Sequence, residues 1–197
     1  MTSPRRRQKN PSAPLPAARP LRALGVPELR ARFDLALRDG DGLAGAHCVN
    51  ELMLRGEMAA NVEPMLEHLW ARAAALVPDW LPMRHVERLP EIYEICARFT
   101  SARRGQFNLY LVLLDYSDSR ADPFGLYVGM TKYPPHERFD QHKAGIRHAG
   151  SVLRRGLELL TGPVMHLQHI SRAEAARIEV QLGEVLAAEG FFVQGGH

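Results

Sequence analysis

Cysteine is scarce in this chain, which has two in 197 residues, and no two cysteines stand at the CxxC spacing typical of zinc sites. Cys48 and Cys96 are too few to build the disulfide framework of a small secreted domain. The chain also lacks any run close to the roughly 18 consecutive apolar residues that span a membrane. Its basic N-terminus leads into proline-rich sequence rather than an apolar segment, so a secretory signal is not expected. These absences predict a cytoplasmic protein with free thiols and no membrane segment.

Acidic residues are missing from positions 1–27, which hold six arginines and lysines. Residues 28–100 carry a net charge of −4 and residues 101–197 one of +1, so the net charge of +3 comes from the N-terminal segment. Residues 1–20 also contain five prolines and predict a disordered basic arm, which either attracts phosphate non-specifically or only aids solubility. The nearly neutral C-terminal half counts mildly against tight nucleic-acid binding by bulk charge.

Residues 21–104 have the apolar periodicity of helices. The first run contains Leu29, Phe33, Leu35 and Leu37 and ends at the glycines and aspartates of residues 39–42. Three further runs are separated by Gly56, Pro78 and Pro82. These apolar positions favour a helical core over a cofactor site, and the pattern does not reveal what this region does.

From residue 105 onward the pattern changes to short strands alternating with helices. Two apolar runs are close enough in sequence to pair as antiparallel strands, and Ser171 and Glu174 form a capping box at the start of a long helix. Prolines 134 and 135 suit the first turn of a further helix. The predicted elements are strands over 107–114, 124–130 and 163–170, and helices over 135–145, 151–160 and 171–189. Residues 105–197 are therefore expected to form an α+β domain with a small three-stranded antiparallel sheet flanked by helices, preceded by an all-α region.

Three side chains suited to an anionic phosphate ester lie close together in the sequence. Tyr127 is on the second strand, and Arg138 and His142 follow on one helical face, four residues apart. A fixed positive charge, an imidazole and a phenol fit a phosphate ester better than a neutral metabolite. On the last predicted helix, Glu179 lies at the edge of the apolar stripe, where a carboxylate must be paired or bind a metal.

These residues resemble a known family. Asn108-Leu-Tyr110 and Tyr127-Val-Gly129 resemble the two halves of the GIY-YIG endonuclease signature. Arg138-x-x-x-His142 resembles the family's helix motif, and Glu179 resembles the glutamate on its later helix. The stretch from Tyr127 to Gly145 is particularly similar to small bacterial members. The resemblance covers about residues 106–193, a little under half of the chain.

The resemblance implies a domain that cleaves DNA phosphodiester bonds with one divalent metal ion. Glu179 would hold Mg²⁺ or Mn²⁺, since hard carboxylate oxygens suit both ions. Arg138 would bind the scissile phosphate, and Tyr110 would help to activate the attacking water. Tyr127 and His142 would position that water or relay a proton. A phenol is a poor base at neutral pH unless a nearby positive charge lowers its pKa, which makes Lys132 a secondary candidate.

Lys132, Lys143 and Arg147 are candidate contacts for the nucleic acid. The chain departs from the family at Asn108, which replaces a usual glycine, and at its C-terminal end, where no asparagine follows the last helix. Gln194 takes the place of that asparagine, or the role is unfilled. No separate C-terminal DNA-binding domain is expected, so target recognition would come from residues 1–100, an oligomer or a partner.

Other interpretations stay open at this point. The alternative function is a catalytically inactive domain of the same fold that binds nucleic acid or a protein. A third hypothesis is that the acidic helical region binds a protein partner. Glu179 has an alternative role in an internal salt bridge with Arg138. His166 and His169 are expected to be ordinary surface histidines rather than metal ligands.

Overall fold

A computed structural model describes residues 19–195 except 103, 122 and 145–150. The chain divides between Pro90 and Glu91 into two compact units, so most of helix α4 groups with the second unit rather than with the helical region preceding it. Arg147 and residues 1–18 of the predicted arm over residues 1–20 lie outside the described part of the chain, whereas Arg19 and Pro20 are described. No described helix is both long and apolar enough to cross a membrane.

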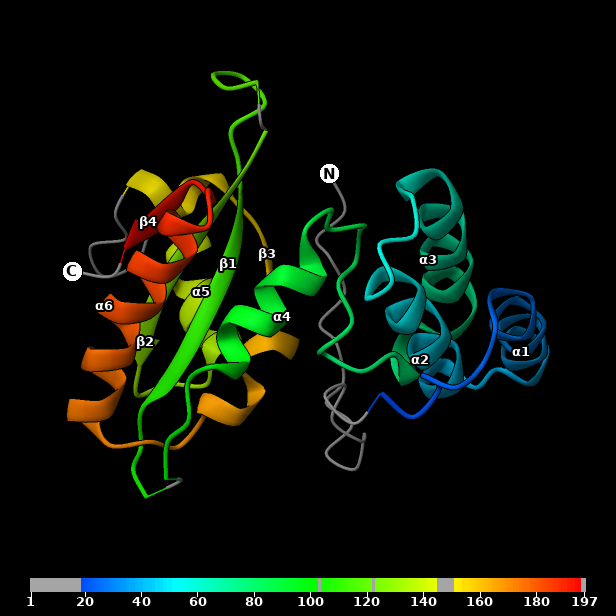
Figure 1. The fold of residues 1–197 in the computed structure, drawn as a ribbon, viewed down its shortest axis with the longest axis horizontal. Helices are drawn as coiled ribbons and strands as arrows, with labels where there is room; N and C mark the ends of the chain where they lie inside the picture. Colours follow the sequence, from blue (N-terminus) through cyan, green and yellow to red (C-terminus); the bar gives the residue numbers. More distant parts are fainter. Residues whose placement is uncertain (1–18, 103, 122, 145–150, 196–197) are drawn as a thin grey trace. The chain divides into compact units, whose positions relative to one another are not determined.

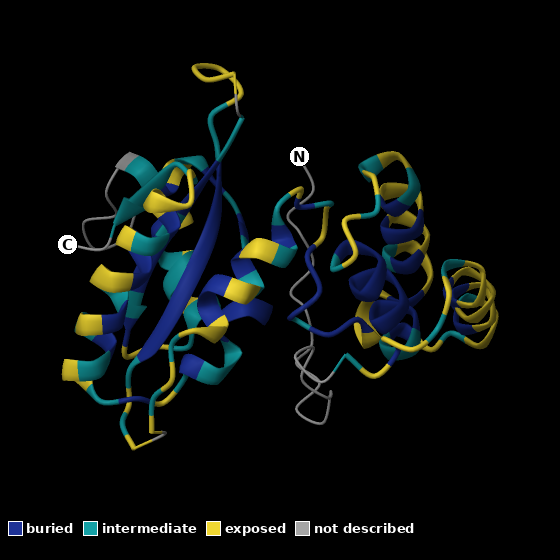
Figure 2. Ribbon diagram, in the orientation of Figure 1, coloured by how far each residue is buried: buried dark blue, intermediate teal, exposed yellow. Residues whose placement is uncertain are grey.

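The first unit is helical. Its elements are α1 (Val26–Asp39), α2 (Gly42–Met53), α3 (Ala59–Ala73) and the 3-10 turn η2 (Ala74–Leu76). Helix α1 ends where Gly40 adopts a left-handed conformation at φ 69°, and α2 begins directly afterwards at Asp41, whose carboxylate accepts from Ala44 N at 2.9 Å. Helix α2 is buried along nearly its whole length (Figure 2). Leu35, expected in the core, is 49% exposed, because α1 buries only the face that carries Leu29 and Phe33.

A buried carboxylate ties the start of the described chain to α2. Glu51 is 2% exposed and accepts hydrogen bonds from Arg19 Nη2 at 2.8 Å and from Arg55 Nε at 2.7 Å. Burial acts to raise the pKa of Glu51, but the two guanidinium groups outweigh it and leave that pKa below its usual value. Arg55 also donates to the carbonyl oxygens of Leu24 and Arg22. The segment before α1 is therefore held by charge-assisted hydrogen bonds.

The second unit is an α+β domain around a four-stranded mixed sheet in the order β3-β1-β2-β4. Strand β1 is central and buried on both faces (Figure 2), as its unbroken apolar run predicts. In Figure 1, α5 lies behind the sheet and α6 in front of it. The elements are α4 (Leu89–Ala97), β1 (Asn108–Asp115), β2 (Phe124–Thr131), α5 (Pro135–Lys143), η3 (Ser151–Arg155), β3 (Gly156–Leu159), η4 (Gly162–Leu167), α6 (Arg172–Ala188) and β4 (Val193–Gly195).

The predicted antiparallel pairing of the first two strands is confirmed, since Asn108 pairs with Thr131 and Asp115 with Phe124. The position of the third strand was wrong. Residues 162–167 form the 3-10 helix η4, and the third strand is β3, which lies inside the expected helix over 151–160. Within η4 the buried residues Val164 and Leu167 are three positions apart, a spacing that fits a 3-10 turn. Of the expected strand, Ile170 forms one isolated antiparallel bridge with Phe107. The sheet also gains β4, parallel to β2, so it is not a purely antiparallel sheet of three strands.

Candidate functional site

Two tyrosines lie side by side on β1 and β2. Tyr110 pairs in register with Gly129, and the rings of Tyr110 and Tyr127 are 5.8 Å apart between centroids. A Cβ atom on Gly129 would lie 2.6 Å from Tyr110 Cζ and 2.7 Å from Tyr127 Cε1. The glycine thus leaves the space in which both rings approach the backbone of β2.

Helix α5 brings an imidazole to the same place. Pro134 and Pro135 start this helix, and His142 in its last turn is 4% exposed. Its Nε2 atom lies 3.5 Å from the Tyr110 hydroxyl oxygen, and its Nδ1 atom has no hydrogen-bond partner among the residues that the structure describes. Arg138, one turn earlier, donates from Nη1 to Gln141 Oε1 at 3.3 Å. That bond is a short-range contact within α5 and uses one nitrogen of the guanidinium group.

Glu179 reaches the site from α6. The helix begins at Ser171, whose hydroxyl accepts from Glu174 N at 3.2 Å, as the capping box predicted. Glu179 Oε1 accepts from Met130 N at 3.0 Å. Among the described residues, β4 pairs with Leu126, Tyr127 and Val128 of β2, and the Met130 amide, two residues farther along, donates to the carboxylate of Glu179. This contact fixes Glu179 at the edge of β2, beside the strand that carries Tyr127.

The pKa of the Tyr110 hydroxyl depends on several of these groups. Burial, followed by the charge and hydrogen bonding of Tyr127, raises the pKa of Tyr110 well above its usual value; Arg138 opposes that shift and Glu179 adds to it. Arg138 and Glu179 both act on the phenol, so they lie in its neighbourhood. The phenol is therefore protonated at neutral pH, because the opposing charge of Arg138 does not outweigh burial.

The pKa of His142 shifts in the opposite direction to that of Tyr110. Burial, and then the positive charge of Arg138, lower the pKa of His142 from its ordinary value of 6.5. The imidazole is therefore neutral at pH 7 and able to accept a proton. Of the groups around Tyr110, it has the protonation state that a general base needs.

The three basic candidates for DNA contact have different surroundings. Lys132 is exposed after β2, and its Nζ atom lies 5.5 Å from the centroid of the Phe107 ring. Lys143 donates from Nζ to the Gly156 carbonyl oxygen at 2.7 Å, which joins α5 to β3. Arg147 is outside the described residues. Lys143 is thus already used by the fold, and Lys132 is the more available cation.

Asn108 has a role that the sequence reasoning missed. Its side chain is buried, donates to the Tyr133 carbonyl oxygen at 3.1 Å, and accepts from His169 N at 3.1 Å. Tyr133 precedes α5 and His169 precedes α6, so one amide joins β1 to the entrances of both helices. The signal in the sequence is a polar residue at the start of an otherwise apolar strand.

Two other residues considered in the sequence lie on η4 and on β4. His166 is half-buried in η4, and its Nε2 atom is 3.1 Å from the Cys96 carbonyl oxygen and 3.0 Å from that of Phe99, so it ties η4 to α4. Gln194 sits on β4 in register with Tyr127. His166 is a structural residue rather than a surface one, and Gln194 places the C-terminal strand beside β2.

The site offers one carboxylate to a metal ion. Within the described ranges, no group of three or more His, Cys, Asp or Glu side chains gathers to hold a metal. Mg²⁺ does not require such a group, because it keeps several water ligands and binds proteins through one or two carboxylates together with substrate phosphates. Glu179 fits that pattern, since the Met130 amide orients its carboxylate as outer-shell donors orient ligands.

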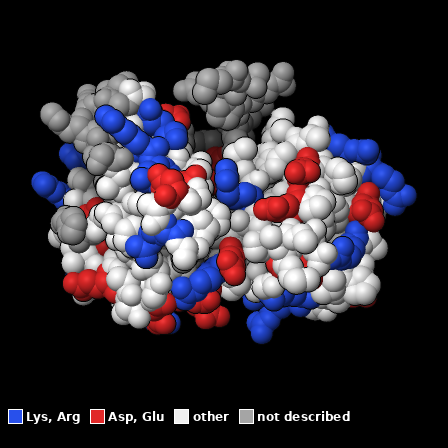
Figure 3. Space-filling view, turned by 90° about the horizontal axis from the view of Figure 1, so that it is seen from above, with Lys and Arg blue, Asp and Glu red and all other residues white. Residues whose placement is uncertain are grey.

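The second unit carries mixed charge on one face. On the face of the second unit seen in Figure 3, lysines and arginines lie among aspartates and glutamates rather than in one basic patch.

Comparisons with protein-family models, curated proteins and solved structures find no match to this chain. Its function is therefore inferred from the geometry and chemistry of the site.

Proposed function

We propose that the second unit is a divalent-metal-dependent endonuclease with a GIY-YIG-type fold that hydrolyses DNA phosphodiester bonds. The observation that supports this most is the gathering of four groups from three elements around one buried phenol. Tyr127, His142, Arg138 and Glu179 either contact the Tyr110 side chain or act on its charge. A tyrosine that only fills a core does not need an imidazole, a guanidinium and a carboxylate near its hydroxyl.

Each residue of the site has its own role in the proposed reaction. Arg138 binds the non-bridging oxygens of the scissile phosphate through its planar fork and stabilises the charge that develops there. A water molecule attacks phosphorus and gives its proton to the Tyr110 oxygen, while the bond from phosphorus to the leaving sugar oxygen breaks and that oxygen takes a proton from solvent. The Tyr110 hydroxyl in turn passes its own proton to the neutral His142 Nε2, 3.5 Å away. Tyr127 holds the ring of Tyr110 in place, and the raised pKa of Tyr110 keeps it in the protonated form that this relay requires.

Glu179 would hold Mg²⁺ or Mn²⁺. When bound, the metal supplies positive charge to the phosphate and its leaving oxygen. The fixed carboxylate at the edge of β2 supports this assignment.

The test is cleavage of supercoiled plasmid with Mg²⁺ or Mn²⁺. Arg138→Ala and Glu179→Ala should each lower the rate by about 10²–10³-fold. Glu179→Gln should be as inactive, although its amide oxygen can still accept from Met130. Matched controls are Arg177→Ala, which loses a comparable bond to Gln181, and Glu184→Ala, which is exposed on the same helix. Intact DNA of every form with the unaltered protein would overturn the proposal.

A second candidate is an inactive module of the same fold that binds nucleic acid or a protein. One oxygen of Glu179 is already engaged by Met130, which favours a structural role for this carboxylate. The module predicts binding of DNA that is unchanged by EDTA, with no cleavage. Metal-dependent cleavage that Glu179→Gln abolishes would exclude it.

A further inference from the structure

An exposed tyrosine lies next to the helix that carries Arg138. Tyr133 is 41% exposed, and among the residues that the structure describes it is the one aromatic side chain on the exposed surface. It follows β2 and precedes α5. The amide of Arg138 donates to the carbonyl oxygen of Pro134 at 3.1 Å, so Tyr133 is one helical turn and one residue away from Arg138. Their Cα atoms are therefore within about 10 Å of each other.

Two buried side chains hold the backbone of Tyr133. Its amide donates to Thr131 Oγ1 at 3.0 Å, and its carbonyl oxygen accepts from Asn108 Nδ2 at 3.1 Å. Pro134 and Pro135 follow and restrict φ at the next two positions. A residue whose backbone is already fixed loses less freedom when its ring contacts a ligand.

The residue before this tyrosine adds a positive charge. Lys132 is exposed, and its Nζ atom lies 5.5 Å from the centroid of the Phe107 ring, a distance at which an ammonium group is attracted to the face of an aromatic ring. Lys132 and Tyr133 thus place a cation and an exposed ring at consecutive positions. Proteins that bind single-stranded nucleic acid combine positive charge for the backbone with aromatic rings on which bases stack.

Given the proposed nuclease function, on which this inference rests, we propose that Tyr133 stacks on an unpaired base beside the scissile phosphate. The substrate is then DNA with unpaired nucleotides at the point of cleavage. In a continuous duplex, neighbouring bases cover both faces of each base, and a side chain can insert between them only by breaking that stacking. An unpaired base offers its face to the ring directly.

The charge of the second unit favours this substrate over a continuous duplex. Residues 101–197 carry a net charge of +1, and basic and acidic residues are mixed on the face seen in Figure 3. Non-specific binding of duplex DNA depends almost entirely on positive charge that neutralises phosphates. A base stacked on Tyr133 adds affinity that does not depend on the net charge of the unit.

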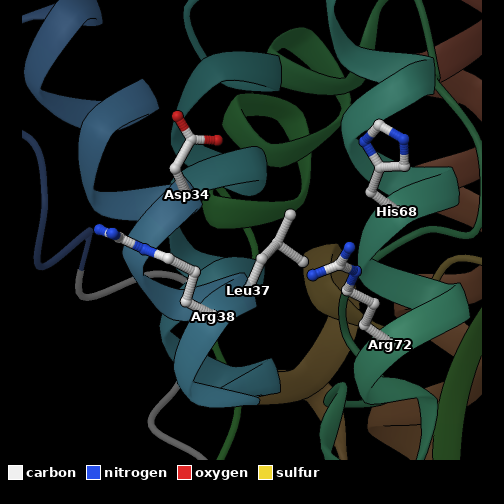
Figure 4. A pocket seen from close by; sticks show the side chains of 5 residues that line it. All are labelled: Asp34, Leu37, Arg38, His68 and Arg72. Atoms are coloured by element: carbon white, nitrogen blue, oxygen red, sulfur yellow. The ribbon is translucent and has the colours of Figure 1, made fainter.

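The hollow of the first unit does not have a comparable arrangement. It has a volume of about 470 Å³ and is lined by residues of α1 and α3 (Figure 4). The Arg38 guanidinium points away from Arg72, and Leu37 lies between them, so these two cations do not face one ligand (Figure 4). The contact with the nucleic acid is therefore assigned to the second unit, beside Arg138.

The experiment measures DNA binding by the full chain through fluorescence anisotropy in EDTA, which prevents metal-dependent cleavage. The probes are a short single-stranded DNA and the duplex that it forms with its complement. Tyr133→Ala should weaken binding of the single strand by about tenfold, equivalent to about 1.4 kcal/mol, and should affect the duplex much less. Tyr133→Phe keeps the ring and should bind like the unaltered protein. The matched control, Leu35→Ala, removes an exposed apolar side chain from the first unit and should change neither affinity.

Three results would overturn the proposal: Tyr133→Ala weakens neither DNA, it weakens both equally, or Tyr133→Phe loses as much affinity as Tyr133→Ala. Failure of the unaltered protein to bind the single strand would overturn it as well. Circular dichroism checks that the variants fold. Folding is expected, because the bonds of Tyr133 to Thr131 and Asn108 use only its backbone atoms.

Cleavage in Mg²⁺ separates this proposal from the nuclease function itself. The substrates are a duplex and the same duplex with a short mismatched segment, whose bases are unpaired. Preferred cleavage at the mismatched segment, reduced in Tyr133→Ala, supports both. Cleavage without that preference overturns the role of Tyr133 alone. Binding of the single strand that depends on Tyr133, without cleavage of any DNA, overturns the nuclease function and supports Tyr133 as a contact for unpaired bases.

Discussion

Gly129 illustrates, at the scale of one residue, how the site depends on a missing side chain. In Gly129→Ala the new Cβ would meet the rings of Tyr110 and Tyr127 at 2.6–2.7 Å. We expect the unfolding free energy to fall by about 1–3 kcal/mol, because rigid rings must shift in a packed unit. Urea unfolding measures the loss, and near-ultraviolet circular dichroism reports the moved tyrosines.

Tyr110→Ala provides the control for this prediction. Removing the ring opens space over residue 129, so the cost of Gly129→Ala should be smaller in the Tyr110→Ala background. Equal costs in both backgrounds would mean that the contact with Tyr110 does not explain the glycine.

His142 makes stability depend on pH. Its pKa is lowered in the folded protein, so below about pH 6.5 the unfolded chain binds the proton that the folded chain excludes. The contribution of the neutral, buried imidazole is therefore complete above the unfolded pKa and is lost as the pH falls below it. The difference in unfolding free energy between the protein and His142→Gln should thus favour the protein less at pH 5 than at pH 7.5. A difference independent of pH would contradict this assignment.

Asn108 belongs to the scale of elements, because it joins β1 to the loops that lead into α5 and α6. Asn108→Ala removes partners from the Tyr133 carbonyl and the His169 amide. Losing both hydrogen bonds of the buried Asn108 side chain should lower the unfolding free energy by about 1–3 kcal/mol. Chemical unfolding gives the total, and faster hydrogen exchange at the His169 amide would locate the change. Gln106→Ala, at an exposed neighbouring position, should leave both unchanged.

The elements differ in how far local sequence predicts them. Strands β1 and β2 and helix α6 follow from an apolar run, a short polar loop and a capping box, all of which act within a few residues. Strand β3 has four residues and gains its stability from pairing with Val112 and Leu113 of β1, so its own sequence carries little signal. Strand β4 has three residues and is likewise defined by its neighbour.

At the scale of the whole molecule, two compact units carry different chromophores. Both tryptophans, Trp70 and Trp80, lie in the first unit, and all five tyrosines lie in the second. Glu51→Gln removes the charge that binds Arg19 and Arg55, and should destabilise the first unit by about 2–3 kcal/mol. In urea the tryptophan-fluorescence midpoint should fall while the tyrosine signal keeps its midpoint.

The converse variant completes this test. Asn108→Ala should shift the tyrosine transition and leave tryptophan fluorescence unchanged, and Glu63→Gln, at an exposed position on α3, should shift neither. A common midpoint that moves in every variant would mean that the two units unfold as one.

The sequence by itself determined the α+β character of the second unit, the helices of the first, and the candidate residues Tyr110, Tyr127, Arg138, His142 and Glu179. Periodicity, caps and motif spacing are local properties, so they can be read without coordinates. Only the tertiary structure decided what those residues contact. The bonds that define the site join residues 32 to 61 positions apart, and the raised pKa of Tyr110 and lowered pKa of His142 come from burial. Contacts and burial of this kind arise when distant segments pack together, and no local pattern records them.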